Sequence, residues 1–553
     1  MPLRLVSLLI SAALAASSTA ALAAPGALWV APLGPDRGLA EAVATGATLR
    51  DRLPDAVVLD DAAAAARLGE AGFAPEGPFV PDPAAEIFLV RHHAADTFAG
   101  PPASPDIDWT APGVRVLWSR GGEAVVQAVD GLPADRAYAH AHRQVLSSRP
   151  LRWPDRAPAP DFRRGTTEFA PEIDSIVAAV DSALYDPWIL DLAGAAGVTV
   201  GGSPHTFTTR YTHNSQCDLA EQYAYEAFQA MGYTVEYDDF NVQSTTARNV
   251  IATLPGSVTP ENVYIFCGHL DSTSPLPNSS ARGANDNASG SAAVLAGADI
   301  LRDYEFESTI RFILFTGEEQ GLYGSQHYVL EALSNGDNIL GVINCDMIAW
   351  YGSRYRVDIE GELFADDFMS VMADACAEFT GLGSAKVYGA WGSDHVPFLN
   401  QGIPTFLAIE SDYASYPCYH QTCDTASQNK VGFGVEITQA CLATLAHAAG
   451  VVSTTDAIEV PPGRLQLQAR PNPFRDGTTI RFRLEEAGHV RLAVHDVTGR
   501  EQRRLLDGRL DAGAHERAWS GRGARGTQLP SGVYYLRFEA RKFSATERLI
   551  ITR

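Results

Sequence analysis

The chain has little positive charge for its length. Its 553 residues carry 42 Lys and Arg against 66 Asp and Glu, a formal net charge of −24 at pH 7. The shortage is uneven: residues 1–463 hold 24 basic against 56 acidic side chains, about −32, and residues 464–553 hold 18 against 10, about +8. Such a change of sign indicates a change of module. It argues against nucleic acid as a partner of the long acidic part.

Long apolar runs are scarce as well. The one at the N-terminus follows Arg4, consists of Leu, Val, Ile and Ala, and closes with Ala21-Leu22-Ala23, an A-x-A cleavage signal. It is too short to span a bilayer, and no stop-transfer pattern follows it. We therefore predict that residues 1–23 are a secretory signal peptide, with a membrane anchor as the alternative. The expected location is secreted or cell-surface.

Cysteine is also sparse. There are seven, an odd number, so at least one thiol is free or intermolecular. Cys418 and Cys423 bracket His420 in a loop, where an exported, oxidising setting favours a disulfide that fixes His420, and a zinc site built from both thiolates is the alternative. The other five lie in apolar or helical contexts typical of inert core residues: Cys217, Cys267, Cys345, Cys376 and Cys441.

The length predicts several domains. Residues 24–164 are rich in Ala, Pro, Asp and Gly and show no metal-ligand or nucleophile spacing, so we predict a separate N-terminal region. Residues 165–455 alternate strand-like and helical patterns, which predicts an α/β sheet flanked by helices. After a linker at 456–463, residues 464–553 show apolar residues at every second position, as in Ile480 and Phe482, which predicts an antiparallel β-sandwich.

Polar side chains follow three predicted strands at their carboxyl ends. The strands cover 264–267, 310–315 and 340–343, and the polar residues after them are His269 and Asp271, Glu318 and Glu319, and Asp346. Ligands of open α/β sheets bind just beyond the carboxyl ends of strands, so we expect these side chains at one edge. Asp271 is placed to turn back and accept the free ring N–H of His269, the usual support of a metal-binding histidine.

Two loops add further candidates. Asp286 lies in a polar segment, 283–290, that precedes a helical run over 292–301. His420 lies in a loop after the predicted strand 405–409. Histidine and carboxylate side chains together suit zinc, cobalt or manganese, and zinc is the default outside the cell.

At this point the chain resembles the M28 family of co-catalytic zinc aminopeptidases, secreted bacterial members in particular. The resemblance covers roughly residues 165–455. The motifs that carry it occur in the family's order: Gly268-His269-Leu270-Asp271-Ser272, the segment from Ala284 to Gly290, the segment from Glu318 to Ser325, Asp346-Met347, Ser393-Asp394-His395, Tyr419-His420 and Asp424-Thr425.

The resemblance implies a fold and a set of roles. The fold is the mixed β-sheet flanked by helices of the zinc-dependent exopeptidases, which is phosphorylase/hydrolase-like. Two Zn²⁺ ions are implied, bridged by Asp286, with Glu318 as the general base and Asp271 counted among the catalytic residues. The remaining ligands divide into His269 and Asp346 for one ion, and Glu319 and His420 for the other. Secreted relatives carry a disulfide at the Cys418–Cys423 spacing. Residues 24–164 precede this protease-like domain in a chain predicted to be exported, so we predict that they form a pro-segment.

The chain also departs from the family's pattern. Asn285 and Asn287 flank Asp286 where relatives often carry Asp, which alters the charge around the ligands but removes none of them. Ala390 and Trp391 stand where some relatives place a tyrosine that stabilises the oxyanion, so that role is unassigned. Two members of the Ser-Asp-His motif, Asp394 and His395, are expected to be supporting or structural residues.

The implied activity is hydrolysis of the N-terminal residue of peptides with a free N-terminus. The alternatives are a carboxypeptidase-like hydrolase, a glutaminyl cyclase, which uses fewer metals, or a non-catalytic surface adhesin, which would not need Glu318. Three aromatic residues are either pocket or core: Phe398, Phe406 and Tyr413. The C-terminal module resembles sorting and FlgD-like Ig modules, which predicts contact with the cell surface or the secretion machinery.

Overall fold

The computed structural model describes residues 169–452 without a break, together with shorter stretches of 28–162 and 467–551. The predicted signal peptide and the linker 456–463 lie outside the described residues. The chain divides into two compact units, residues 1–453 and 454–553. Among the described helices, none combines the length and the apolar character needed to cross a membrane.

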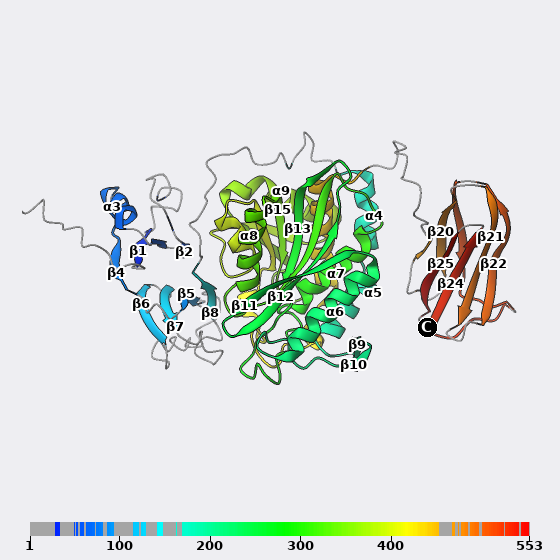
Figure 1. Cartoon of the computed structure of the whole chain (residues 1–553), viewed down its shortest axis with the longest axis horizontal. Coiled ribbons are helices and arrows are strands. Elements are labelled where there is room, and N and C mark those ends of the chain that lie inside the picture. The colour runs from blue at the N-terminus through cyan, green and yellow to red at the C-terminus, as the bar shows by residue number, and fades with distance from the viewer. Residues whose placement is uncertain are drawn as a thin grey trace, which may run out of the picture. The chain divides into compact units, whose positions relative to one another are not determined.

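The first unit is built on an eight-stranded sheet (Figure 1). Its strands lie in the order β11 (Thr234–Val242), β12 (Thr245–Leu254), β14 (Ser308–Phe315), β13 (Thr259–His269), β15 (Asn338–Cys345), β18 (Thr405–Glu410), β16 (Arg356–Gly361) and β17 (Gly383–Tyr388). The four central strands, β14, β13, β15 and β18, run parallel to one another. Strand β12 is antiparallel to β14, and β16 is antiparallel to β18. The predicted mixed sheet is therefore confirmed.

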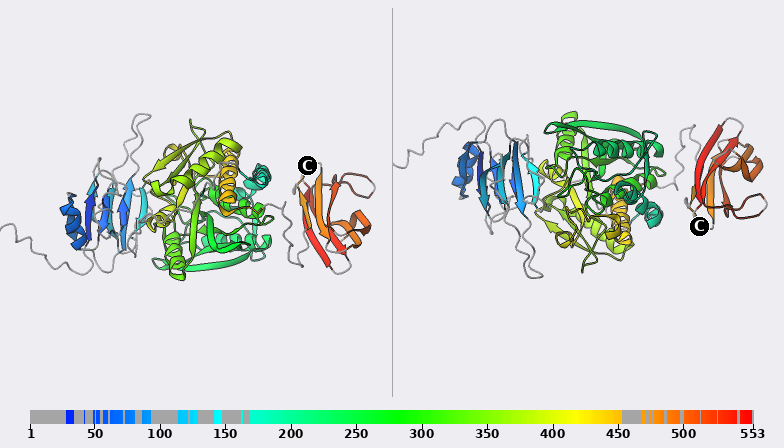
Figure 2. Two further views of the ribbon diagram at one scale, coloured as in Figure 1. Left: turned by 90° about the horizontal axis from the view of Figure 1, so that it is seen from above. Right: turned by 90° about the horizontal axis from the view of Figure 1, so that it is seen from below.

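Helices cover both faces of this sheet (Figure 2). Successive side chains of β13 point to opposite faces, so Phe266 packs in the larger core and Ile265 in the smaller one. The larger core is closed by α4 (Pro171–Ala179), α5 (Ser182–Leu192), α6 (Ser215–Met231), α7 (Ala288–Leu301), α9 (Asp366–Phe379) and α11 (Val431–Ala449). The smaller core is closed by α8 (Tyr323–Asn335) and α10 (His395–Asn400). Burial on both faces explains why the central strands are almost continuously apolar.

Helix α7 begins earlier than the sequence pattern predicts. The periodic apolar run starts at residue 292, but the helix starts at Ala288. The reason is a cap, since Oδ1 of Asn287 accepts a hydrogen bond from the Gly290 backbone N–H at 2.8 Å. The polar segment that carries Asp286 is thus joined directly to the helix, which fixes its direction.

The N-terminal region belongs to the same unit as the peptidase-like sheet. One of its sheets has the order β2 (Asp51–Leu53), β3 (Ala56–Leu59), β1 (Leu28–Pro32) and β4 (Glu76–Phe79). A second sheet has the order β6 (Val114–Arg120), β7 (Glu123–Ala128), β5 (Glu86–His92) and β8 (Ala141–Val145). Helix α3 covers Ala62–Glu70. The backbone N–H of Val145 donates to the carbonyl of Gly321 at 3.0 Å, and Nε2 of Gln326 donates to the carbonyl of Val145 at 3.2 Å. Strand β8 is therefore attached to the loop and helix that follow β14.

The second unit is a sandwich of two antiparallel sheets. One has the order β19 (Leu467–Arg470), β20 (Thr478–Leu484), β23 (Gly513–Trp519), and the other β22 (Glu501–Leu510), β21 (Gly488–Asp496), β24 (Gly532–Ala540), β25 (Phe543–Ile551). Alternate residues of facing strands, such as Phe482, Leu492 and Phe538, form its core. The predicted antiparallel β-sandwich is confirmed.

Candidate metal centre

The five predicted ligands converge at one edge of the central sheet. His269 is the last residue of β13, and the other two strand-end ligands, Glu319 and Asp346, follow β14 and β15. Because these strands are parallel neighbours, their carboxyl ends meet. Asp286 enters from the loop before α7 and His420 from the loop after β18. All five are buried.

Asp286 lies between the two histidines. Its Oδ1 is 3.3 Å from Nε2 of His269, and its Oδ2 is 3.1 Å from Nε2 of His420. On the first side, Oδ1 of Asp346 is 3.4 Å from Nε2 of His269. On the second side, Oε2 of Glu319 is 3.1 Å from Nε2 of His420. The geometry has two halves that share one carboxylate. Burial alone would raise the pKa of Asp286, but the two imidazoles hold it well below its ordinary value.

The donor atoms fit divalent cations. Buried atoms on both sides have no partner with hydrogen-bond geometry: His269 Nε2, Asp286 Oδ2, Glu319 Oε1 and Asp346 Oδ1. Leaving several buried carboxylate atoms without partners is costly, and bound cations remove that cost. Imidazole nitrogen together with carboxylate oxygen is a donor set that zinc accepts.

Glu318 lies next to this centre. Its Oε2 is 3.9 Å from Nε2 of His269, and the residue lines the central cavity. Burial raises the pKa of Glu318 well above its ordinary value; His269 opposes the rise and the neighbouring Glu319 adds to it. A carboxylate with a raised pKa beside a cation site is suited to accept and return a proton.

Asp271 supports the centre differently from the prediction. The predicted ring contact is made by its backbone: Nδ1 of His269 lies 3.1 Å from the carbonyl oxygen and 3.6 Å from Oδ1. The carboxylate instead accepts the backbone N–H groups of Glu318 and Glu319, both at 3.3 Å, and the hydroxyl of Thr212 at 3.0 Å. The short turn after β13 brings the carbonyl to the ring first. Asp271 is thus a positioning residue that connects His269 to the Glu318 loop.

Ser393 supports the other strand-end carboxylate and was not predicted as a site residue. Its hydroxyl donates to Oδ2 of Asp346 at 2.7 Å, and it accepts from Nδ2 of Asn344 at 2.8 Å. This contact turns the free Oδ1 of Asp346 toward His269. The Ser-Asp-His motif is visible in the sequence, but nothing in its local pattern indicates that the hydroxyl, rather than an ionisable member, meets a metal ligand.

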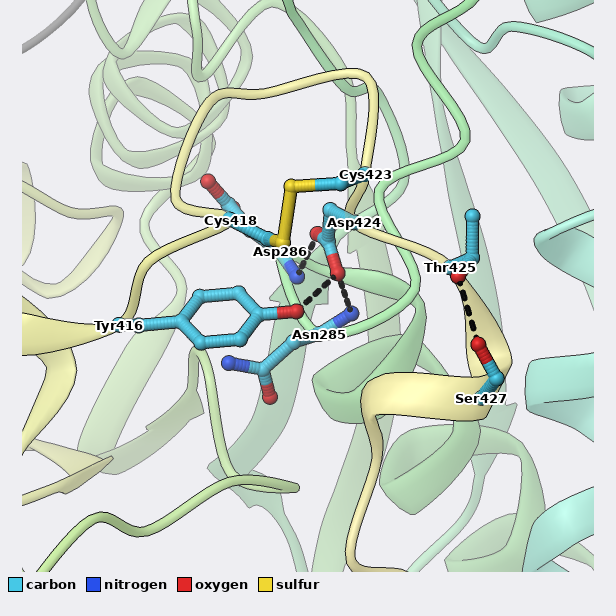
Figure 3. The surroundings of a disulfide bond; sticks show 8 residues. All are labelled: Asn285, Asp286, Tyr416, Cys418, Cys423, Asp424, Thr425 and Ser427. Atoms are coloured by element: carbon cyan, nitrogen blue, oxygen red, sulfur yellow. Dashed lines mark hydrogen bonds between the residues drawn. A yellow bond between two sulfur atoms is a disulfide. The ribbon is translucent and has the colours of Figure 1, made fainter.

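The His420 loop is fixed by a disulfide and by Asp424. Cys418 and Cys423 are bonded, as predicted, with an S–S distance of 2.09 Å (Figure 3). The other five cysteines are free and buried. His420 has φ +51°, a conformation that only surrounding structure can hold in a non-glycine residue. The short disulfide loop supplies that restraint.

Asp424 connects this loop to the loop of the bridging ligand (Figure 3). Its carboxylate accepts the backbone N–H of Asn285 at 2.9 Å, that of Asp286 at 3.0 Å, and the hydroxyl of Tyr416 at 2.8 Å. Burial raises the pKa of Asp424 to about 7, although these hydrogen bonds oppose the rise. Asp424, the first residue of the Asp424-Thr425 motif, therefore positions Asp286.

The two asparagines beside Asp286 serve as structural amides. Asn285 donates from Nδ2 to Glu410 at 2.8 Å and accepts the Ala349 backbone N–H at 2.9 Å. Asn287 donates from Nδ2 to the carbonyl of Cys345 at 2.9 Å while its Oδ1 caps α7. An aspartate at either position would lose the donor, so this chain's surroundings match Asn.

The cavity at the centre measures about 30 Å³ and has an acidic and an apolar wall. Of the three aromatic candidates, Tyr413 lines it, while Phe398 and Phe406 are core residues with no exposed surface. Trp391 also lines it and belongs to one apolar cluster with Leu89 and Val125 of the N-terminal region. That cluster joins segments more than 260 positions apart in the sequence, and no local pattern indicated it.

Comparisons with known proteins match two parts of the chain to families. Residues 249–445 match peptidase family M28, and residues 471–543 match the FlgD Ig-like domain. The chain therefore contains an M28 peptidase domain, the class that the sheet and its edge site define, followed by a FlgD Ig-like domain.

Individual relatives show how far the similarity extends. A probable zinc metalloprotease of Leptosphaeria maculans is 32% identical over 34% of this chain and 51% of its own length. Leupeptin-inactivating enzyme 1 of Streptomyces exfoliatus is 33% identical over 35% of this chain and 47% of its own. The chain thus spans about half the length of the curated relatives it matches. The LapA aminopeptidase of Legionella pneumophila, 15% identical, superimposes with a TM-score of 0.51 over 67% of this chain and 100% of that one, which shows a shared fold.

Proposed function

We propose that the protein is a two-zinc aminopeptidase that hydrolyses the N-terminal residue of peptides. The observation that carries this proposal is the position of Asp286, whose two oxygens each face a different histidine. One ion would be held by His269 and Asp346, the other by Glu319 and His420, with Asp286 shared. The similarity to a probable zinc metalloprotease and the fold shared with an aminopeptidase support the same class.

The chain's own groups would divide the chemistry between them. When bound, the zinc ions polarise the scissile carbonyl and lower the pKa of water. Glu318 takes a proton from the attacking water and returns it to the leaving amine. Asp271 keeps Glu318 in place through the backbone of its loop. Ser393 orients Asp346, and Asp424 orients Asp286.

Preference for a free N-terminus is supported by the charge of the cavity. Its carboxylates, among them Glu360, attract an ammonium group, and its apolar wall of Leu407 and Ile409 suits an uncharged side chain. A carboxypeptidase-like hydrolase would need a cationic group for the substrate carboxylate, and the residues that line this cavity include no Lys or Arg. Two complete half-sites disfavour a glutaminyl cyclase, and Glu318 disfavours an adhesin.

The test is release of amino acids from matched peptides. Unblocked peptides should yield free N-terminal residues, N-acetylated copies should not, and a chelator should abolish the reaction until zinc is restored. Equal cleavage of blocked and unblocked peptides would contradict the aminopeptidase assignment. Activity that survives metal removal would contradict the zinc mechanism.

Residues 24–164 are proposed to mask the site as a pro-segment of an exported enzyme. Two observations support this: β8 pairs with Gly321, close to Glu319, and the cavity residue Trp391 shares an apolar cluster with the N-terminal region. The central space of about 30 Å³ is far below the roughly 300 Å³ of ordinary ligand pockets. A chain starting near Gly165 should bind two metals and be at least as active as the full chain. A folded, metal-loaded but inactive truncation would contradict masking.

The C-terminal module is proposed to act in export or surface attachment. Its sandwich has its own core and its sequence is basic, which suits an anionic cell surface. Removing residues from about 457 onward should leave kinetics on small peptides unchanged and alter where the protein accumulates. An unchanged location would contradict the sorting role.

A further inference from the structure

A second cluster of metal-ligating side chains lies at the edge of the peptidase sheet. Asp238 is on the edge strand β11, and His327 and Glu331 occupy positions i and i+4 on α8, which packs against that strand (Figure 1). Oδ1 of Asp238 is 3.0 Å and Oε2 of Glu331 is 3.1 Å from Nε2 of His327. None of the three residues belongs to the centre described above.

The geometry around Nε2 suits a cation. A single ring nitrogen carries at most one proton, yet two carboxylates face it, and it is shielded from solvent with no partner in hydrogen-bond geometry. One ligand atom from each residue lies within 4.8 Å of the others. Ligand distances of about 2.0–2.2 Å to zinc bring three donors within such a span.

The ligands are held in place by other contacts. The ring of His327 stacks on Phe240, with centroids 5.5 Å apart and planes 24° apart. The second oxygen of Asp238 accepts from Nδ2 of Asn249 at 2.8 Å, which leaves Oδ1 turned toward the histidine. Support of this kind from a neighbouring amide is typical of metal-binding carboxylates.

We propose that Asp238, His327 and Glu331 bind a third divalent cation of the zinc or manganese class, separate from the two ions of the catalytic centre. One imidazole and two carboxylates form a donor set that these ions accept. Next to His327 is an open cleft of about 380 Å³ with room for water to complete the coordination. It is lined by Asp239, Phe240, Asn241, Tyr323, Gln326, His327 and Leu330.

The site is connected to the catalytic loop through Asn249. This side chain is buried, donates to the carbonyl of Gly324 at 3.0 Å, and accepts the backbone N–H of Thr316 at 3.2 Å. Thr316 lies two residues before Glu318. A cation on Asp238 therefore stabilises the packing of α8 on β11 and the strand end that carries the Glu318 loop.

The test counts zinc on the whole, untagged protein. Wild type, His327→Gln and Glu331→Gln are dialysed to equilibrium against ZnCl₂, and bound zinc is measured by elemental analysis. Wild type should hold one equivalent more than either variant. The matched control is His489→Gln, since His489 is an exposed histidine paired with one carboxylate, Asp507, at 3.3 Å; this variant should equal wild type.

The difference in bound zinc between wild type and the two edge variants tests this proposal independently of the proposed function. One equivalent lost in both edge variants supports the site, whatever the catalytic centre holds. Equal zinc in wild type and both edge variants overturns it and leaves an imidazolium paired with two carboxylates. A second readout is thermal: added zinc should raise the melting temperature of wild type more than that of Glu331→Gln. Glu331 is half-exposed, so that variant is expected to fold.

Discussion

The catalytic centre described above and the edge cluster of Asp238, His327 and Glu331 combine the same types of side chain, imidazole and carboxylate, in different surroundings. In each, an imidazole nitrogen faces two carboxylates at 3.0–3.4 Å. At the centre the side chains of His269 and Asp286 are 1% and 6% exposed. At the edge those of His327 and Glu331 are 35% and 55% exposed. At the edge the Asp238 side chain is 13% exposed. We infer that burial, more than the choice of ligands, decides how strongly each cluster depends on a cation.

The physical reason is the cost of an uncompensated charge. Buried carboxylates that lose their partner have no water to replace it, whereas half-exposed ones are solvated and their ion pairs are weak. Substitutions at the centre should therefore have large effects and those at the edge small ones. The predictions below test that ranking, from the largest effect to the smallest.

The largest effect is expected for Asp286→Ala. Because this carboxylate serves both halves, occupancy of both ions should fall and activity should drop to background. Elemental analysis after dialysis in zinc-free buffer measures the first effect, and peptide hydrolysis the second. His327→Gln is the comparison variant and should retain the two ions of the centre, which separates loss of the edge site from loss of the bridge. Two tightly bound ions in Asp286→Ala would show that the bridge is not needed.

Glu318→Gln should separate chemistry from metal binding. The amide keeps the shape of the side chain and removes the base, so kcat should fall on the order of 10²–10⁴-fold while zinc content stays that of wild type. Steady-state kinetics with parallel metal analysis measures both quantities. Near-normal turnover with intact zinc would exclude Glu318 as the base.

The sequence predicts the ligands better than it predicts their support. His269, Glu319 and Asp346 follow apolar strands, and the parallel arrangement of those strands makes their meeting a consequence of the fold. The hydrogen bond from Ser393 to Asp346 depends on where the loop before α10 returns to the sheet, and no local pattern encodes that return. Sequence patterns indicate which face or end of an element a residue occupies. Which hydrogen-bond acceptor its side chain meets there depends on the tertiary structure.

The long-range packing of the N-terminal region could not be predicted from the sequence either. Short apolar runs over 27–30, 86–90 and 114–118 predict strands, and the structure has strands over 28–32, 86–92 and 114–120. Their shared apolar cluster with Trp391 could not be predicted, because it joins segments whose own patterns are satisfied by any apolar neighbour. Asp271 shows the same limit on a small scale. Its position two residues after His269 was informative, but which of its oxygens meets the ring depended on the turn.

A smaller effect is expected for Ser393→Ala. Loss of the hydroxyl frees Asp346 to rotate and leaves the buried Nδ2 of Asn344 without this acceptor. Supporting residues of metal ligands typically contribute 10–100-fold in affinity, so one of the two ions should bind about 10–100-fold more weakly. Competition with a zinc chelator measures this. Ser427→Ala, which removes an exposed hydroxyl beside Thr425 (Figure 3), is the control and should bind like wild type.

The smallest effect is expected for Glu331→Gln in protein stripped of divalent cations. Its contact with His327 is half-exposed and joins neighbouring turns of one helix, a kind of pair that contributes about 0.3–0.5 kcal/mol. Urea denaturation with a chelator present should show a loss of free energy of unfolding no larger than about 1 kcal/mol. With zinc present the loss should be greater, because wild type then gains binding energy that the variant cannot. The catalytic centre contributes equally to both proteins and cancels from the difference.

An equal loss with and without zinc would place the edge cluster among ordinary surface ion pairs. A large loss without zinc would mean that burial does not set the ranking of the two clusters.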